Sequence, residues 1–351
     1  MIFTNFIVYQ NKNLGDVLLT TPLLRVLLDH LESKGRKGTL HLISKKQSHA
    51  LLASMDKRIE FHVKPQSFRA WVTLLAKLPK GGSSLMLIAH VSGVALFIAK
   101  ILGLKSVCSE PLSKLGFRVD YAVPFRYTPW RHISEQHLDL WRRVGGVVAA
   151  EQQRLFAPDF PETESNWEIN FTNYIVIHPG SRWMFKTPSR NFWGDLTSRL
   201  SGFDGDIVVT GSADRDEREL CELVANTVGG VSLAGKTTIV QLAQLIQYAK
   251  GYLGVDTFAS HLAAAYRTPG LVLFGPTSPE IWGPYGSNQV LQVFRALQGF
   301  PCMPCHADGC GGSKRSDCLD KLGAEAAFLA FCKAVSMEAL HEPKASRVSQ
   351  T

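Results

Sequence analysis

Short apolar segments alternate with amphipathic helical patterns along nearly the whole chain, and this alternation limits the possible folds more than any other feature. In the first half, the predicted strands cover residues 5–8, 39–43, 85–89 and 121–123. The predicted helices there cover residues 17–31, 94–102 and 133–144. Short apolar strands joined by helices are typical of parallel sheets. The first half is therefore predicted to be a doubly wound α/β domain.

The segment 149–170 interrupts this alternation with two prolines and a polar stretch, and we expect it to link two domains. The pattern then restarts, with predicted strands at residues 174–177, 207–210, 252–255 and 271–274. The predicted helices of this half cover residues 192–200, 215–228, 239–249 and 260–266. A chain of 351 residues suits two domains. We expect domains at 1–160 and 161–340, facing each other across a cleft, and a disordered tail at 341–351.

The charge is divided unevenly between the two halves. Residues 1–160 carry 22 Lys and Arg against 11 Asp and Glu, a net of +11, whereas the rest carries 16 against 19, a net of −3. A basic half attracts an anionic partner such as a phosphorylated glycolipid, an anionic membrane or nucleic acid. No finger spacing, aromatic-basic motif or arginine-rich arm indicates nucleic-acid binding, so an acidic glycolipid is favoured. The candidate contacts, each also typical of a solvated surface, are Lys12, Lys64, Arg118, Arg126 and Arg131.

Residues 84–104 are apolar and long enough to raise the question of a membrane span. His90 and Lys100 interrupt this run, and Ser92-Gly93 divides it into a strand and a helix. The N-terminus lacks the basic start, long apolar run and small-residue cleavage site of a signal peptide. Seven cysteines, an odd number, argue for free thiols rather than a disulfide framework. We therefore expect a soluble, cytoplasmic protein.

Four of the cysteines lie close together in the sequence, as Cys302-x2-Cys305-x4-Cys310-x7-Cys318. Four thiolates could bind zinc tetrahedrally. The spacing is irregular for a zinc module, so a reduced, cysteine-rich loop is the alternative. The sequence leaves both open.

The segment from Asn13 to Pro22 leads from the first predicted strand into a helix. Gly15 allows a tight turn there, and Asp16 lies at the helix N-terminus. Its carboxylate could simply cap the helix, since Asp favours that position. It could also accept a proton from a substrate hydroxyl.

Two later segments also run from a strand end toward a helix. The first contains Ser181, Arg182 and Lys186, a hydroxyl and two cations that suit a diphosphate, although an ordinary basic loop has the same composition. The second contains Asp256 and Thr257, which could meet the sugar and phosphates of a nucleotide sugar. His261 follows on the predicted helix and could equally be a packed core residue. These segments make the second half the candidate nucleotide-binding domain.

These segments occur in the order typical of one family, and the sequence resembles glycosyltransferase family 9, the ADP-heptose:lipopolysaccharide heptosyltransferases. The late cysteines and the residues around Arg182 make it most similar to the heptosyltransferase III branch. The matching segments are 15–22, 178–186, 233–237, 256–261, 274–277 and 282–286. The resemblance implies a GT-B fold and inverting transfer without a metal or cofactor. It also implies an ADP-heptose donor, an acceptor in the inner core of lipopolysaccharide, and peripheral contact with the inner membrane.

The resemblance also implies roles for individual residues. Asp16 resembles the family's general base. Ser181 and Lys186 resemble its phosphate-binding positions. On physical grounds, the cations Arg182 and Lys186 could also stabilise a departing diphosphate and so stand in for Mg²⁺. The positions that resemble the donor site are Asp256, Thr257 and His261.

One departure from the family is Phe258, which stands where many relatives have glycine, whose backbone can approach a ligand closely. It keeps open a non-catalytic binding protein of the same architecture. A nucleotide-sugar epimerase on the same fold is the other alternative, and it would need further acid–base groups around the donor sugar.

Overall fold

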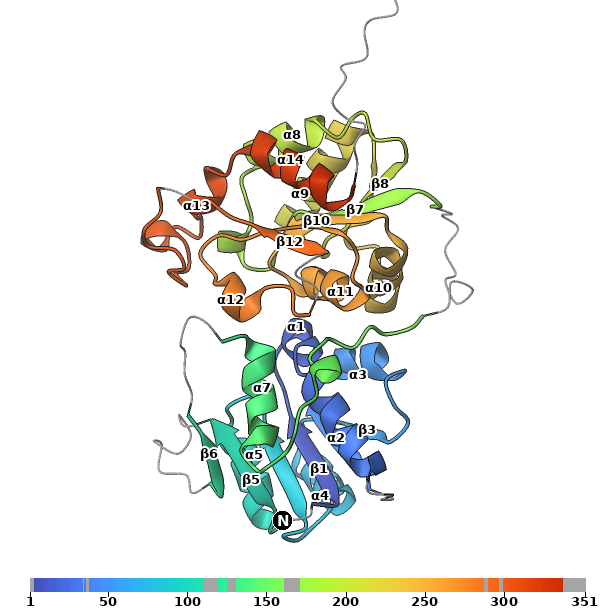
Figure 1. The fold of residues 1–351 in the computed structure, drawn as a ribbon, viewed down its shortest axis with the longest axis vertical. Coiled ribbons are helices and arrows are strands. Elements are labelled where there is room, and N and C mark those ends of the chain that lie inside the picture. The colour runs from blue at the N-terminus through green and yellow to red at the C-terminus, as the bar shows by residue number, and fades with distance from the viewer. Residues whose placement is uncertain are drawn as a thin grey trace, which may run out of the picture. The chain divides into compact units, whose positions relative to one another are not determined.

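The chain divides into two compact units, each with its own sheet (Figure 1). The computed structural model describes residues 3–33, 35, 38–109, 119–124, 131–160, 171–286, 290–296 and 299–336. Arg118, Arg126 and the expected tail 341–351 lie outside the described residues. One unit comprises Met1–Pro161 and Glu280–Gly286, and the other comprises Glu162–Pro279 and Ser287–Thr351.

Both sheets have six parallel strands in the doubly wound order. The first consists of β1 (Asn5–Tyr9), β2 (Leu40–Ser44), β3 (Ile59–Val63), β4 (Ser84–Ile88), β5 (Lys105–Ser109) and β6 (Tyr121–Val123). The second consists of β7 (Tyr174–His178), β8 (Asp206–Val209), β9 (Val231–Ser232), β10 (Gly251–Val255), β11 (Gly270–Leu273) and β12 (Leu291–Phe294). The strand orders are β3-β2-β1-β4-β5-β6 and β12-β11-β10-β7-β8-β9. The predicted α/β class is confirmed.

Helices cover both faces of each sheet. In the first unit these are α1 (Leu14–Leu18), α2 (Thr21–Ser33), α3 (Lys46–Leu52), α4 (Phe68–Lys77), α5 (Gly93–Ile101), α7 (Ile133–Arg142) and the 3-10 helix η1 (Ala150–Gln152). In the second they are η3 (Met184–Lys186), α8 (Arg190–Ser198), α9 (Arg215–Val228), α10 (Ile239–Tyr248), α11 (Phe258–Tyr266), η4 (Cys310–Gly312), α13 (Asp317–Asp320) and α14 (Ala324–Ala334). The short α12 (Pro279–Trp282) lies where the chain passes from the second unit into 280–286.

The apolar core of each unit lies between its sheet and these helices. In the first unit, Phe6 of β1 meets Trp141 of α7 edge to face at 5.6 Å, while α4 and α5 pack over the other face around Ile43 and Met86. In the second, α8, α9 and α14 cover one face and α10 and α11 the other (Figure 1). Trp193 of α8 is fully buried among them. Strands buried on both faces explain the continuous apolar runs in the sequence.

The helix predicted at 17–31 is two helices, and this prediction was wrong. Helix α1 ends at Leu18 and α2 begins at Thr21. Pro22 has no N–H to donate to the Leu18 carbonyl, and the hydroxyl of Thr21 donates to that oxygen instead, at 2.6 Å. The break turns α1 into a separate five-residue helix at the end of β1.

Residues 84–104 contain β4 and α5 and end directly before β5, as their division at Ser92-Gly93 into a strand and a helix predicts. Among the described residues, no helix is both long and apolar enough to cross a bilayer.

Residues 280–286 group with the first unit because they pack on α7. The ring of Tyr285 stacks on His132 with centroids 4.6 Å apart, and its hydroxyl bonds to the Glu135 carboxylate. The imidazole Nε2 of His132 lies 3.0 Å from the Gly283 carbonyl oxygen. Burial is the main cause that lowers the pKa of His132 to about 4. A neutral ring donating from Nε2 satisfies this contact.

Candidate active site

The strand order of each sheet places one reversal point between two central strands. The order reverses between β1 and β4 in the first sheet and between β7 and β10 in the second. The chain leaves the two strands at such a point toward opposite faces, and ligands of doubly wound sheets bind in the resulting crevice. The candidate catalytic and donor-binding residues of the sequence follow three of these four strands.

In the first unit, Asp16 is the third residue of α1, directly after β1. Its Oδ2 accepts a hydrogen bond from the Asn13 N–H at 3.3 Å, so it does support the start of the helix. Lys12 Nζ lies 4.0 Å from the other carboxylate oxygen, and the Asp16 side chain is 17% exposed. The carboxylate therefore caps the helix through one oxygen and faces a cation and solvent through the other.

A buried polar network fixes the backbone of Asp16. The hydroxyl of Thr20 donates to the Asp16 carbonyl at 2.8 Å, and the Gln10 amide donates to that hydroxyl at 3.1 Å. His137 of α7 approaches the same hydroxyl at 3.2 Å. Burial lowers the pKa of His137 to about 4. A neutral ring thus completes the network that holds α1 in place.

His90 follows β4, on the other side of the reversal point, and the sequence did not identify it as a site residue. Its ring stacks on Tyr9 with centroids 6.3 Å apart. Burial lowers its pKa first, the positive charges of Lys12, Lys45 and Lys64 lower it further, and the Asp16 carboxylate opposes them. Its Nδ1 has no hydrogen-bond partner among the described residues. Of the predicted acceptor contacts, Lys12 thus lies beside Asp16, and both Lys12 and Lys64 act electrostatically on His90.

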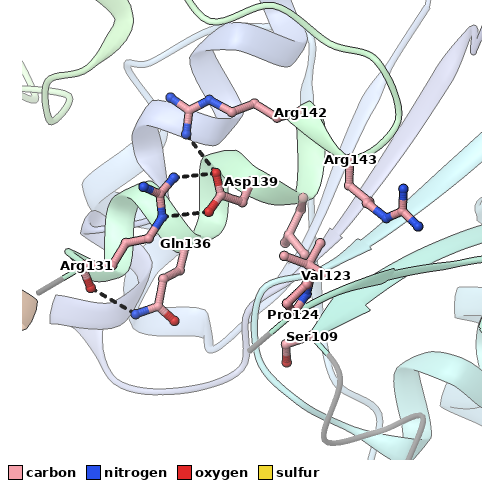
Figure 2. A pocket seen from close by; sticks show the side chains of 9 residues that line it. Ser109, Val123, Pro124, Arg131, Gln136, Asp139, Arg142 and Arg143 are labelled. Carbon is pink, nitrogen blue, oxygen red and sulfur yellow. Dashed lines mark hydrogen bonds and ion pairs between the residues drawn. The ribbon is translucent and has the colours of Figure 1, made fainter. Parts of the chain in front are cut away.

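Arg131, a third predicted acceptor contact, lies in a separate pocket of about 440 Å³ beside α7 (Figure 2). Its guanidinium binds both carboxylate oxygens of Asp139, at 2.6 and 2.7 Å. Arg142 Nη1 reaches the same carboxylate at 2.9 Å, and Arg143 also lines the pocket. No lysine lines it. Arg131 is therefore an ion-paired residue of the α7 pocket and is not among the cations that act on His90.

In the second unit, Lys186 and Asp256 form an ion pair across the reversal point. Lys186 ends η3 after β7, Asp256 directly follows β10, and Lys186 Nζ lies 2.6 Å from Asp256 Oδ2. The Thr277 hydroxyl donates to the same oxygen at 2.8 Å. The side chains of Lys186 and Asp256 are 17% and 4% exposed. The pair is a buried, hydrogen-bonded unit to which Thr277, not predicted as a site residue, also belongs.

The remaining predicted residues of this unit lie in the segments after the same two strands. Ser181 is buried and its hydroxyl accepts the Trp183 N–H at 3.2 Å. Arg182 is exposed, with its guanidinium 5.7 Å from the centre of the Trp183 ring. Arg182 is thus an exposed cation in the same segment as Lys186, the cation of the buried ion pair.

Thr257 is the N-cap residue of α11, and its N–H donates to the Ser260 hydroxyl at 3.2 Å. His261 is buried one turn along this helix, and Phe258 is its partly exposed first residue. A phenyl group therefore stands at the α11 N-terminus.

Two glycines, one after β7 and one in β10, allow neighbouring side chains to pack closely against the backbone. A Cβ on Gly180 would lie 2.5 Å from Glu217 Cγ, and one on Gly254 would lie 2.4 Å from the Tyr252 hydroxyl. Glu217 also lies beside His178, with 3.9 Å between Oε1 and Nε2. Burial lowers the pKa of His178, and the Glu217 charge opposes that effect. Glycine at 180 and 254 is therefore required by packing.

Two Asp-x-Asp pairs occur in this unit, and such carboxylate pairs could ligate a divalent cation. Asp206 begins β8, at the edge of the sheet opposite the candidate residues. Asp214 caps α9 by accepting the N–H of Asp216 at 3.0 Å. Neither pair belongs to the group formed by Lys186 and Asp256.

The four late cysteines lie near one another but do not form a closed ligand group. Cys302, Cys305 and Cys310 are exposed, while Cys318 is buried. Burial first, and then the charges of the other three thiols, raise the pKa of Cys318 to about 12. Among the described residues, the only set of three or more potential ligand side chains with atoms within 4.8 Å of one another is His41, Glu60 and His62.

The chain is similar to known proteins in sequence and in fold. The family model described as "Glycosyltransferase family 9 (heptosyltransferase)" matches residues 102–312. Lipopolysaccharide heptosyltransferase 3 of Escherichia coli is 33% identical over 121 residues, which are 34% of this chain and 36% of that protein. The match thus spans only about a third of this curated relative's length.

Two solved structures share the fold over most of the chain. ADP-heptose LPS heptosyltransferase II of Escherichia coli has a TM-score of 0.72 at 18% identity, covering 95% of this chain and 99% of that one. The Escherichia coli heptosyltransferase WaaC with ADP has a TM-score of 0.63 at 19% identity, covering 83% and 93%. These matches show the GT-B fold predicted from the sequence.

Proposed function

Because the chain belongs to glycosyltransferase family 9, the heptosyltransferases, we propose that it transfers heptose from ADP-heptose to the inner core of lipopolysaccharide. The observation that carries the proposal is the Lys186–Asp256–Thr277 group at the reversal point of the second sheet. This is where a doubly wound domain binds a nucleotide. A relative solved with ADP has the same fold.

The second unit would bind the donor. The Lys186 ammonium and the Arg182 guanidinium can neutralise a diphosphate, and the Ser181 hydroxyl can donate to it. Asp256 orients Lys186 through the 2.6 Å ion pair. Thr257 at the start of α11 and the buried His261 complete the proposed donor contacts.

Asp16 would act as the general base. Transfer forms a bond from an acceptor hydroxyl oxygen to the anomeric carbon of heptose, while the bond to ADP breaks. A base removes the hydroxyl proton and the leaving diphosphate keeps the bonding electrons. Attack from the face opposite ADP inverts the anomeric configuration. Stabilisation of the leaving group by Arg182 and Lys186 makes a metal ion unnecessary for this step.

The basic first unit would bind the acceptor. Lys12 and Lys64 act electrostatically on the same imidazole, that of His90, and can meet phosphates on the lipopolysaccharide core. Arg131 belongs to the neighbouring α7 pocket, while the two other proposed arginines, Arg118 and Arg126, lie outside the described residues. The same positive charge supports peripheral contact with the cytoplasmic face of the inner membrane.

The direct test is to incubate the protein with ADP-heptose and lipopolysaccharide truncated within its inner core, to weigh the glycolipid, and to examine the nucleotide sugar by NMR, since an epimer has the same mass as its substrate. We expect the glycolipid to gain one heptose while ADP is released. An altered sugar on unchanged ADP would instead identify an epimerase. Binding without any new product would identify a non-catalytic protein.

A further inference from the structure

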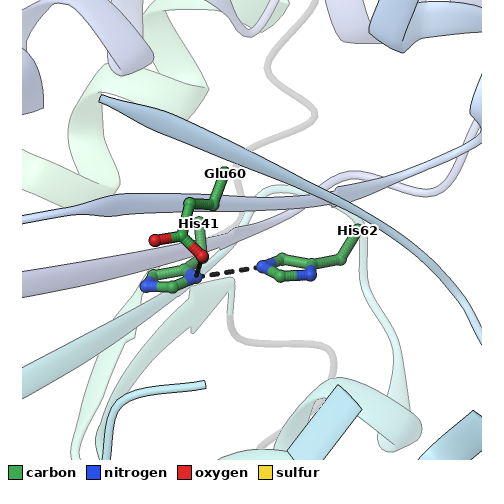
Figure 3. Close-up of side chains that lie close together, drawn as sticks. All are labelled: His41, Glu60 and His62. Atoms are coloured by element: carbon green, nitrogen blue, oxygen red, sulfur yellow. Dashed lines mark hydrogen bonds and ion pairs between the residues drawn. The ribbon is translucent and has the colours of Figure 1, made fainter. Parts of the chain in front are cut away.

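Two histidines and a glutamate meet on the first sheet, away from the residues assigned to catalysis (Figure 3). His41 lies on β2, and Glu60 and His62 lie on the neighbouring β3. The parallel register pairs His41 with Glu60 and Ile43 with His62, so the three side chains project from the same face. His41 is three residues from the carboxyl end of β2, roughly 10 Å along the strand from the edge where Asp16 follows β1.

The distances among the three side chains suit a single metal ion. His41 Nδ1 lies 3.0 Å from His62 Nε2 and 3.5 Å from a carboxylate oxygen of Glu60. Ligand atoms about 2.0–2.1 Å from a tetrahedral zinc ion stand roughly 3.3 Å from one another. The observed spacings lie on either side of that value. Two imidazoles and one carboxylate are also a ligand set that zinc accepts, with a fourth position for water.

The surroundings orient the ligands for this role. His41 Nε2 lies 2.9 Å from the Thr39 hydroxyl, which fixes the ring with Nδ1 toward the other two side chains. Such a partner on the second ring nitrogen is typical of metal-binding histidines. His41 is 3% exposed and Glu60 is 49% exposed, so the group is anchored inside and open to solvent at Glu60.

The charges around the group also fit a cation. Burial, followed by the effect of His41, lowers the pKa of His62 to about 4, so its ring is neutral near pH 7, as a ligand must be. Lys77 and His49 also act on His62 and oppose a positive ion, whereas Glu60 favours it. Glu60 thus supplies the compensating charge.

We propose that His41, Glu60 and His62 bind a divalent transition-metal ion of the zinc type. The ion would link β3, the edge strand of the sheet, to β2. Its role is structural, since none of the three residues takes part in the transfer proposed above. Thr39 acts as a positioning residue that holds the His41 ring.

The test is to strip the full chain of metal with a chelator and titrate it with Zn²⁺ by calorimetry, and with Co²⁺ by absorption spectroscopy. We expect one Zn²⁺ per chain and a rise in the melting temperature. Thr39→Val, which removes a partner of a ligand, should weaken Zn²⁺ binding by about 10- to 100-fold. His62→Gln, which removes a ligand itself, should weaken it by more than about 100-fold. Glu60→Gln, at an exposed position, keeps the test valid if His62→Gln fails to fold, and it too should weaken binding at least 10-fold.

The cysteines provide the matched control. The double variant Cys302→Ser/Cys305→Ser should leave Zn²⁺ binding at this site unchanged. Any thiolate charge-transfer band of bound Co²⁺ should be equally strong in the wild type and in His62→Gln. The proposal is overturned if no Zn²⁺ binds, or if binding survives both His62→Gln and Glu60→Gln. It is equally overturned if binding disappears only in the cysteine variant.

Discussion

Removing the Lys186 ammonium should destabilise the second unit more than removing both charges of its ion pair. The Asp256 carboxylate is 4% exposed in the wild type, and in Lys186→Ala it keeps the hydrogen bond from Thr277 but loses its cation. Removing one partner of a buried ion pair costs about 3–5 kcal/mol. Because Lys186 is itself 17% exposed, water can partly replace it, and we expect about 3 kcal/mol, the lower end.

The double variant Lys186→Ala/Asp256→Asn carries no unpaired charge and should lose only about 1 kcal/mol, the net value of an ordinary hydrogen bond. For a unit of this size, a loss of about 3 kcal/mol lowers the melting temperature by roughly 6–12 °C. Scanning calorimetry on the wild type, both single variants and the double variant measures the interaction energy of the pair. If the two single losses add to within about 0.5 kcal/mol of the double, the pair is not energetically linked and the argument fails.

The same variants test the proposed role of the pair in donor binding. Lys186→Ala should weaken ADP and ADP-heptose by similar factors, because both ligands carry the diphosphate. Titration calorimetry with the two ligands gives both factors. Arg190→Ala, which removes an exposed cation paired with Glu219, is the matched control and should leave both affinities unchanged. A loss confined to acceptor binding would place Lys186 outside the donor site.

Three further predictions concern the first unit. Asp16→Asn should keep donor affinity but lower turnover by ~10²-fold or more. The control Asp214→Asn, which removes a carboxylate cap from α9, should keep turnover unchanged. Near-normal turnover in Asp16→Asn would leave Asp16 as a helix cap only. The Michaelis constant for the acceptor should rise with salt concentration more steeply than that for the donor. The reason is that exposed charges are screened beyond ~8 Å at physiological ionic strength. An acceptor Michaelis constant that does not change with salt would contradict recognition by the basic unit. Burial holds the pKa of His137 at about 4 in the folded state, so below pH 6.5 the unfolded chain binds more protons, and stability should fall toward pH 4 by up to about 1.4 kcal/mol per pH unit. Urea unfolding at pH 7, 6 and 5 should therefore show a shallower fall in His137→Asn, and equal slopes would refute the cause.

The central strands could be predicted from the sequence because they are buried on both faces. β1, β4, β7 and β10 all overlap the predicted strands and differ from them by at most one residue at either end. The missed strands β3, β5, β9 and β12 are short, polar or at sheet edges. In β3, Ile59-Glu60-Phe61-His62-Val63 does alternate apolar and polar residues, which is the pattern of a half-buried strand, so this strand could have been predicted from the sequence.

The candidate residues could be located in the sequence, but their partners could not. Asp16, Lys186 and Asp256 follow strand ends, which the pattern reveals. Lys186 and Asp256 are 70 residues apart, and no local signal pairs them. His90 was visible only as an interruption of an apolar run, although it directly follows a strand. In the sequence, Arg131 cannot be told apart from an unpaired surface cation, and only the structure shows its two hydrogen bonds to the Asp139 carboxylate.

The two reversal points differ in how they hold their carboxylates, and this difference fits the proposed roles. Asp256 is closed in by Lys186 and Thr277, so it can orient a cation but is poorly placed to receive a proton. Asp16 is anchored through its backbone carbonyl by Thr20, which leaves its carboxylate partly exposed beside Lys12. A base must reach a mobile acceptor, whereas a group that orients a phosphate-binding lysine must stay fixed. Of these two carboxylates, that of Asp16 is the one whose exposure fits the proposed base.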